Sequence, residues 1–128
     1  MIGLDTNVLV RYIAQDDKVQ SRRATTLIEK ECSTSMPGYV GLVVLAEVVW
    51  VSESRYDASR EEIARIVRRL LSIRQLIVQD AEVAWKALRA FETGKADFAD
   101  CLIERTAFAA GCVRTMTFDK RAGMTLLA

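Results

Sequence analysis

The chain has 128 residues, the length of one domain, and its 51% apolar and 27% charged residues exclude disordered and fibrous proteins. A net charge of +1 gives no argument for nucleic-acid binding by itself. The absence of histidine excludes Ser-His-Asp and Cys-His catalysis as well as histidine-bound metals. Carboxylates must therefore carry most of any chemistry.

Targeting signals are not evident in this sequence. The N-terminus MIGLDTNVLV lacks a basic leader, and the longest apolar run, 40–51, is shorter than the ~20 residues of a membrane span. These observations predict a cytoplasmic protein without a membrane partner. The three widely spaced cysteines indicate core residues rather than a disulfide or zinc framework. The basic clusters at 18–23 and 60–74 are typical of solvated helix faces more often than of a phosphate track.

The first part of the chain predicts a strand followed by helices. Residues 1–5 form a short apolar stretch that ends in Asp5, and apolar residues at helical spacing follow over 8–13. A second helix is expected at 18–31. A turn then leads into a brief strand at 39–40.

The clearest helix in the sequence covers 59–72, where Ser59 and Glu62 form a capping box ahead of apolar residues at helical spacing. The remaining elements alternate again. They are a strand at 75–80, a helix that Asp80 caps and Gly94 ends, a helix at 97–110 that stops at Gly111, a strand at 113–119, and a last strand within 121–128.

Strands separated by helices predict an α/β domain with a mostly parallel sheet and helices on both faces. Sites in such sheets form beyond the carboxyl ends of the strands. Asp5 and Asp119 both follow predicted strands. We therefore expect the fold to bring these two acids together.

The segment LVVLAEVVWV at 42–51 places Glu47 among nine apolar residues. Its length and the strand just before it favour a helix over a strand, and an apolar helix of this kind predicts that Glu47 is buried. A buried carboxylate needs a partner. That partner is either a basic side chain or a divalent cation shared with Asp5 and Asp119.

Asp97 and Asp100 lie three residues apart at the first turn of a predicted helix. Helix capping explains such acids without any function, and Asp97 fits that explanation. Asp100 immediately precedes the apolar run of 101–103, where the helix enters the core. With Asp5, Glu47 and Asp119, this acid favours the shared cation site.

Four segments carry a family resemblance: LDTNVLV, VLAEVVW, DFADCLI and TFDK. Their identity and order over residues 4–120 resemble the PIN-domain nucleases, specifically the VapC-type toxins of bacterial type II toxin-antitoxin pairs. The resemblance implies a three-layer α/β/α sandwich with a mostly parallel central sheet, formed by one PIN-like domain over 1–128. It also implies an endoribonuclease that depends on Mg²⁺ or Mn²⁺.

The resemblance also assigns roles to residues. Direct or water-mediated metal ligands are expected at Asp5 and Asp100, while Glu47 and Asp119 position the attacking water or a second ion. Asp97 is an additional ligand candidate. Polar support is expected from Thr6, Asn7 and Thr117. The implied partners are an RNA substrate, a cognate antitoxin and a second copy of the chain in a homodimer.

Two alternatives remain at this point. A non-catalytic PIN-like binding module would act through a protein partner, with the acids holding a structural ion or none. A phosphate-handling enzyme similar to haloacid dehalogenases or receiver domains would also use strand-end aspartates. Haloacid dehalogenases expect an aspartate at the position where this sequence has Asn7. Receiver domains need an acidic pair before the first helix and a lysine at a late strand end, and this sequence has neither.

Overall fold

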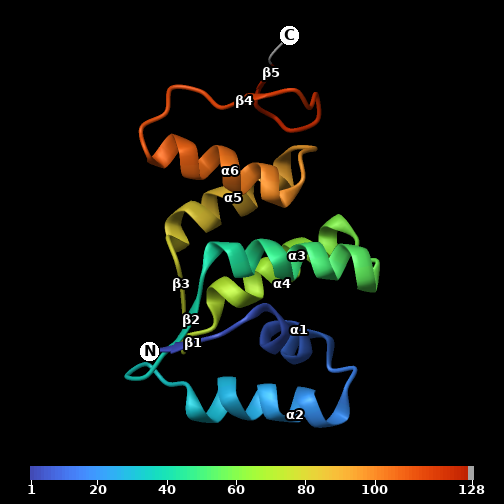
Figure 1. The fold of residues 1–128 in the computed structure, drawn as a ribbon, viewed down its shortest axis with the longest axis vertical. Coiled ribbons are helices and arrows are strands. Elements are labelled where there is room, and N and C mark those ends of the chain that lie inside the picture. The colour runs from blue at the N-terminus through green and yellow to red at the C-terminus, as the bar shows by residue number, and fades with distance from the viewer. Residues whose placement is uncertain (127–128) are drawn as a thin grey trace. The chain divides into compact units, whose positions relative to one another are not determined.

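A three-stranded parallel sheet organises the first part of the chain in the computed structural model, which describes residues 1–126. The strands β1 (Ile2–Gly3), β2 (Gly38–Val40) and β3 (Leu76–Val78) pair in that order (Figure 1). Parallel neighbours require crossover connections, and helices supply them here. The β1–β2 crossover holds α1 (Thr6–Ala14), α2 (Lys18–Thr26) and the π-helical turn η1 (Leu27–Glu31), and the β2–β3 crossover holds α3 (Leu42–Tyr56) and α4 (Arg60–Ser72).

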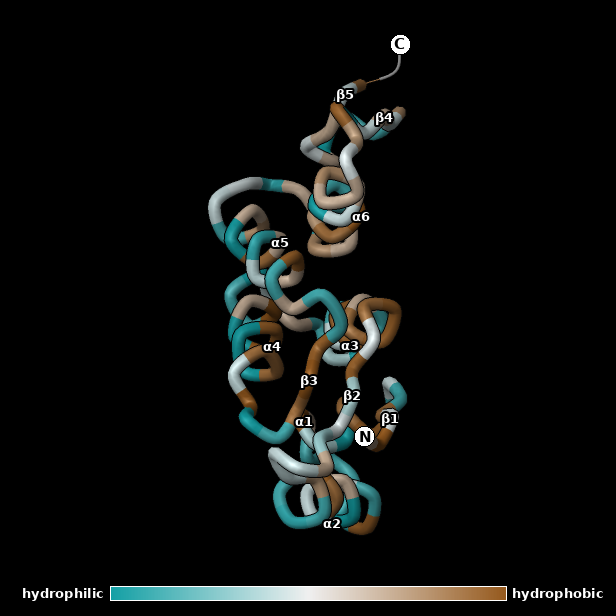
Figure 2. The backbone as a smooth tube through the Cα atoms, turned by 90° about the vertical axis from the view of Figure 1, so that its left-hand side faces the viewer, coloured by the Kyte–Doolittle hydropathy of each residue, from teal (hydrophilic) through white to brown (hydrophobic). Residues whose placement is uncertain are grey.

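Two compact units divide the chain, Met1–Gln79 and Asp80–Ala128. In the first unit α1 packs against α2 and α3, α3 packs against α4, and α4 contacts β3. Figure 2 shows β3 in brown, the colour of hydrophobic residues. The most deeply buried side chains of this unit are Leu9, Ile28, Val40, Leu45, Val48, Ile63, Val67 and Leu70. The organisation as one PIN-like domain over 1–128 stays a prediction.

Gly38 stands where neighbouring side chains leave no room for a Cβ atom. A Cβ built there would lie 2.8 Å from Leu4 Cδ1 and 2.9 Å from Leu76 Cδ2. We expect Gly38→Ala to lower the free energy of unfolding by about 1–3 kcal/mol, since overpacking shifts core side chains. Urea denaturation measures the loss. Gly3→Ala on β1 is the matched control, because its Cβ would meet no atom within 4 Å; equal stability of both variants would contradict the prediction.

The helix expected over 42–51 is confirmed as α3, but the predicted burial of Glu47 is wrong. Glu47 is exposed, and so are Val43 (74%) and Trp50 (67%) on the same side of the helix. The core needs only one apolar stripe from a helix. In α3 the buried stripe consists of the apolar Leu45, Val48 and Val49 together with Ser52.

Local hydrogen bonds explain two further elements of the first unit. The capping box is confirmed: Ser59 Oγ accepts from the Glu62 N–H, and the Glu62 carboxylate accepts from the Ser59 N–H. These bonds lower the pKa of Glu62. The helix predicted at 18–31 forms, but its last turn is π-helical, and the Cys32 N–H donates to the Leu27 carbonyl at 2.8 Å.

Two helices form the body of the second unit. The helices α5 (Ala81–Thr93) and α6 (Phe98–Ala109) pack together, and Phe91 meets Phe98 edge to face with ring centroids 5.9 Å apart. Gly94 and Gly111 follow these helices as predicted. Asp80 occupies the predicted N-cap position of α5, but its backbone is left-handed and its side chain makes no capping hydrogen bond, so the predicted side-chain cap is wrong.

A small parallel sheet completes the second unit. It contains β4 (Met116–Thr117) and β5 (Thr125–Leu126), so the strands predicted within 113–119 and 121–128 are each only two residues long. Residues 127–128 lie outside the described part of the chain. Over residues 1–126, every helix is too short or too polar to cross a membrane.

Candidate active site

Asp5 lies just beyond the carboxyl end of β1 and begins α1. Its backbone is extended, and its Oδ1 accepts a hydrogen bond from the Val8 N–H at 3.2 Å, as an N-cap residue does. The side chain is exposed. The carboxylate is therefore held at a helix N-terminus and can also reach a ligand in solvent.

Glu47 is tied to the residue that follows Asp5. Thr6 Oγ1 donates a 2.9 Å hydrogen bond to Glu47 Oε1, and this bond joins the start of α1 to the middle of α3. No ion pair involves Glu47 within residues 1–126, so a buried basic partner does not explain this glutamate. One oxygen of the exposed Glu47 carboxylate accepts the hydrogen bond from Thr6, and the other can bind a ligand from solvent.

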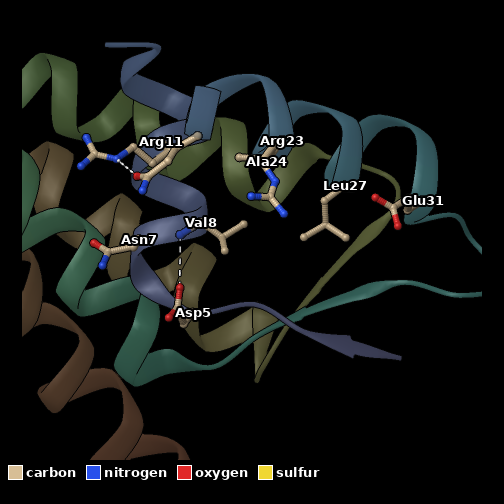
Figure 3. Close-up of a pocket in the computed structure, with 9 residues that line it drawn as sticks. Asp5, Asn7, Val8, Arg11, Arg23, Ala24, Leu27 and Glu31 are labelled. Atoms are coloured by element: carbon tan, nitrogen blue, oxygen red, sulfur yellow. Dashed lines mark hydrogen bonds between the residues drawn. The ribbon is translucent and has the colours of Figure 1, made fainter. Parts of the chain in front are cut away.

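A pocket of about 480 Å³ lies between α1 and α2 and includes Asp5 (Figure 3). Asn7 and Gln20 contribute amide groups to its wall. The charged residues are Asp5, Arg11, Arg23 and Glu31, and the apolar ones are Val8, Ala24 and Leu27. The pocket thus combines a predicted metal ligand with two guanidinium groups.

In the second unit, Asp97 and Asp100 lie at the start of α6. Asp97 occupies the N-cap position, but its side chain makes no capping hydrogen bond, so capping does not account for its carboxylate. Asp100 is half-buried in the first turn. Burial raises the pKa of the Asp100 carboxyl, and the negative charges of Asp97 and Asp119 raise it further, while Arg121 opposes them.

Asp119 is the third carboxylate of this group and follows β4. Its N–H donates to Thr117 Oγ1 at 3.0 Å, so Thr117 holds the backbone from which the acid projects. Asp119 Oδ1 accepts from the Arg121 N–H at 2.9 Å and lies 3.7 Å from Arg121 Nε. The Arg121 side chain is 89% exposed, so this ion pair is largely screened by solvent.

The structure therefore gathers the predicted site residues in two groups, one in each unit. The first contains Asp5, Thr6 and Glu47 with Asn7 nearby, and the second contains Asp97, Asp100, Thr117 and Asp119. Carboxylate oxygens are the donors that Mg²⁺ and Mn²⁺ prefer, and repulsion among three acids favours a cation. Among residues 1–126, no three Asp, Glu, Cys or His side chains converge closely enough to hold one ion. The catalytic and ligand roles stay predictions.

Arg11, Arg23 and Arg121 were not predicted as site residues. Arg23 belongs to the basic cluster at 18–23, which we interpreted as a solvated helix face. The pairing of α1 with α2 turns it toward the pocket, and the return of the chain after β4 places Arg121 beside Asp119. The placement of Arg23 depends on the contact between α1 and α2, whereas Arg121 lies two residues after Asp119 and contacts it locally.

Comparison with known proteins identifies the family. A search of curated protein sequences finds no match to this chain. The family model of the PIN domain, by contrast, matches residues 2–124, nearly the whole chain. The parallel α/β organisation agrees with the family's α/β/α fold class. The chain belongs to the PIN-domain family, whose members are generally metal-dependent nucleases.

Proposed function

We propose that this protein is an endoribonuclease that depends on Mg²⁺ or Mn²⁺ and acts as the VapC-type toxin of a type II toxin-antitoxin pair. The observation that carries the nuclease proposal is the half-buried Asp100, whose pKa is raised by burial and by Asp97 and Asp119. Such a group gains from a bound cation, which offsets the repulsion. Membership of a nuclease family supports the same reaction class.

The side chains would divide the reaction between them. By the resemblance of their segments to PIN-domain motifs, Asp5 and Asp100 would be ligands of the cation, with Asp97 as an additional ligand, and Glu47 and Asp119 would orient water toward the phosphodiester. A divalent cation supplies charge neutralisation at the phosphate and activates water for hydrolysis. Thr6 fixes one oxygen of Glu47, which keeps this acid oriented before substrate arrives.

Asp5→Asn tests this proposal without disturbing the start of α1, because asparagine is also a good N-cap and can keep the Val8 bond. We expect RNA cleavage by the purified protein to require Mg²⁺ or Mn²⁺ and to stop when the ion is chelated. The variant replaces one negatively charged ligand of the ion by a neutral one and should cleave at least about tenfold more slowly. Gel analysis of a labelled RNA measures the rate.

Asp57→Asn is the matched control, since Asp57 is exposed, lies outside the site, and has a left-handed backbone that asparagine tolerates. It should cleave at the wild-type rate. No cleavage of RNA by the wild type with either ion would refute the nuclease proposal. Cleavage that persists in chelator would refute its metal dependence, and equal rates for both variants would remove Asp5 from the site. If calorimetric titration shows that neither Mg²⁺ nor Mn²⁺ binds to the protein, a non-catalytic binding module would be favoured.

The toxin role, the antitoxin partner, the homodimer and a cytoplasmic location belong to the same proposal. They rest on the similarity of the LDTNVLV, VLAEVVW, DFADCLI and TFDK segments to VapC-type toxins. A small reading frame directly upstream, encoding a DNA-binding fold with a flexible tail, would support the pairing. Growth arrest on expression that this second protein relieves would support the toxin role. Equilibrium sedimentation would test the dimer.

A further inference from the structure

We infer that the pocket between α1 and α2 binds one nucleotide of a single-stranded RNA, with Arg23 contacting its phosphate. The inference rests on the proposed endoribonuclease function and assigns a substrate subsite to it. The volume of about 480 Å³ lies within the ~300–1,000 Å³ of small-molecule pockets. This space accommodates one nucleotide rather than a length of chain.

The guanidinium group of Arg23 can bind a ligand in this pocket. Its side chain points from α2 into the pocket in Figure 3, and it has no ion-pair or hydrogen-bond partner within residues 1–126. Arg11 differs, because its Nε donates to Gln20 Oε1 at 2.8 Å and its guanidinium pairs with Asp16 at 3.2 Å. An unpaired guanidinium offers the planar fork that binds phosphate oxygens.

The two acids of the pocket limit the number of phosphates to one. Asp5 and Glu31 line the same pocket as Arg23, so an anion bound by the Arg23 guanidinium shares the pocket with two carboxylates. A continuous phosphate track or an acidic peptide would meet both carboxylates and be repelled. A single phosphate next to Arg23, followed by an uncharged sugar and base, avoids that repulsion.

The remaining lining suits the uncharged part of a nucleotide. Val8, Ala24 and Leu27 present an apolar surface to a ribose or base face. Gln20 already accepts from Arg11 through Oε1, which leaves its amide N–H groups as donors, and Asn7 adds a second amide. Amide groups pair with the exposed edges of unstacked RNA bases. Asp5 lines the same pocket, so the bound nucleotide lies beside a proposed cleavage residue.

The test measures RNA binding separately from cleavage. Fluorescence anisotropy of a short labelled single-stranded RNA, with chelator present, gives the affinity of the full chain over a salt series. We expect Arg23→Gln to weaken binding about tenfold, as loss of one charge-assisted contact predicts. The slope of log affinity against log salt should fall by about 0.7, the value for one phosphate on a single strand.

Two further variants make the result specific. Arg22→Gln removes the same charge from the neighbouring exposed residue, which does not line the pocket, and should bind like wild type. Arg23→Lys keeps the charge but loses the fork, so it should keep the salt slope and lose part of the affinity. Equal effects of Arg22→Gln and Arg23→Gln, or no effect of Arg23→Gln, would overturn the inference.

The same samples separate this inference from the proposed function. Wild-type protein that binds RNA through Arg23 but cleaves none with Mg²⁺ or Mn²⁺ would refute the nuclease proposal and support the subsite. Wild-type protein that cleaves RNA, while Arg23→Gln binds and cleaves equally well, would refute the subsite alone.

Discussion

Asp100→Asn should reduce RNA cleavage at least about a hundredfold while making the folded protein more stable. The activity falls because the variant removes one of the proposed metal ligands, and the chain contains no histidine that could replace this ligand. Stability rises because the variant removes one of three mutually repelling carboxylates. Loss of activity combined with gain of stability is typical of residues retained for function.

The pH dependence of this stability effect follows from the pKa of Asp100. Burial and the charges of Asp97 and Asp119 raise that pKa above the usual 3.8, so the folded state binds more protons than the unfolded chain between the two values. Stability from this group therefore falls as pH rises through that interval. At neutral pH the wild type carries the full penalty and the variant carries none. The difference in Tm should be largest near pH 7 and disappear below about pH 3.8.

Differential scanning calorimetry with and without Mg²⁺ completes the measurement. A cation that binds only the folded state raises Tm, so wild type should gain stability from Mg²⁺ and Asp100→Asn should gain much less. Asp80→Asn is the control, because Asp80 is exposed and its side chain does not cap α5. Cleavage by Asp100→Asn at the control rate would remove Asp100 from the site.

Phe98→Ala is expected to cost about 3–5 kcal/mol of unfolding free energy, as for other fully buried aromatic residues. Phe98 is 0% exposed and packs edge to face on Phe91, so its ring joins the start of α6 to the end of α5. The truncation leaves a cavity and removes that aromatic contact. Since Phe98 lies between Asp97 and Asp100 in the chain, we expect cleavage to fall together with stability.

Phe118→Ala tests whether the loss comes from burial rather than from removing an aromatic ring. Phe118 belongs to the same unit and is 77% exposed, so its truncation should change stability by no more than about 0.5 kcal/mol. Guanidinium denaturation followed by circular dichroism measures both variants. Similar midpoints for the two would show that the Phe91–Phe98 contact does not stabilise α6.

The helices were predictable because their signals are local. The capping box at Ser59 and the apolar spacing of α4 lie within one segment, and Gly94 and Gly111 mark helix ends directly. The strands were harder to delimit. They are two or three residues long, and alternation cannot define boundaries over so few positions.

The site was predictable in its residue types and less so in its geometry. The motif order predicts which acids form the site, and their roles stay predictions. The exposure of Glu47 depends on which stripe of α3 the core uses, and several stripes of that helix are apolar. Asp80 has a residue type that commonly caps helices, yet the backbone enters α5 through a left-handed conformation. Arg23 reaches its pocket only through the pairing of α1 with α2. Tertiary packing decides each of these, and no local pattern encodes it.

The π-helical turn at 27–31 has a consequence for comparing this chain with its relatives. Its hydrogen bonds close over one residue more than those of an α-helix, as the bond from Cys32 to Leu27 shows. A homologue with one residue fewer between the buried positions Ala24 and Cys32 can close the same segment as regular α-helix. Alignments of the family should therefore place single-residue gaps inside this turn, where an insertion leaves the flanking core positions in register.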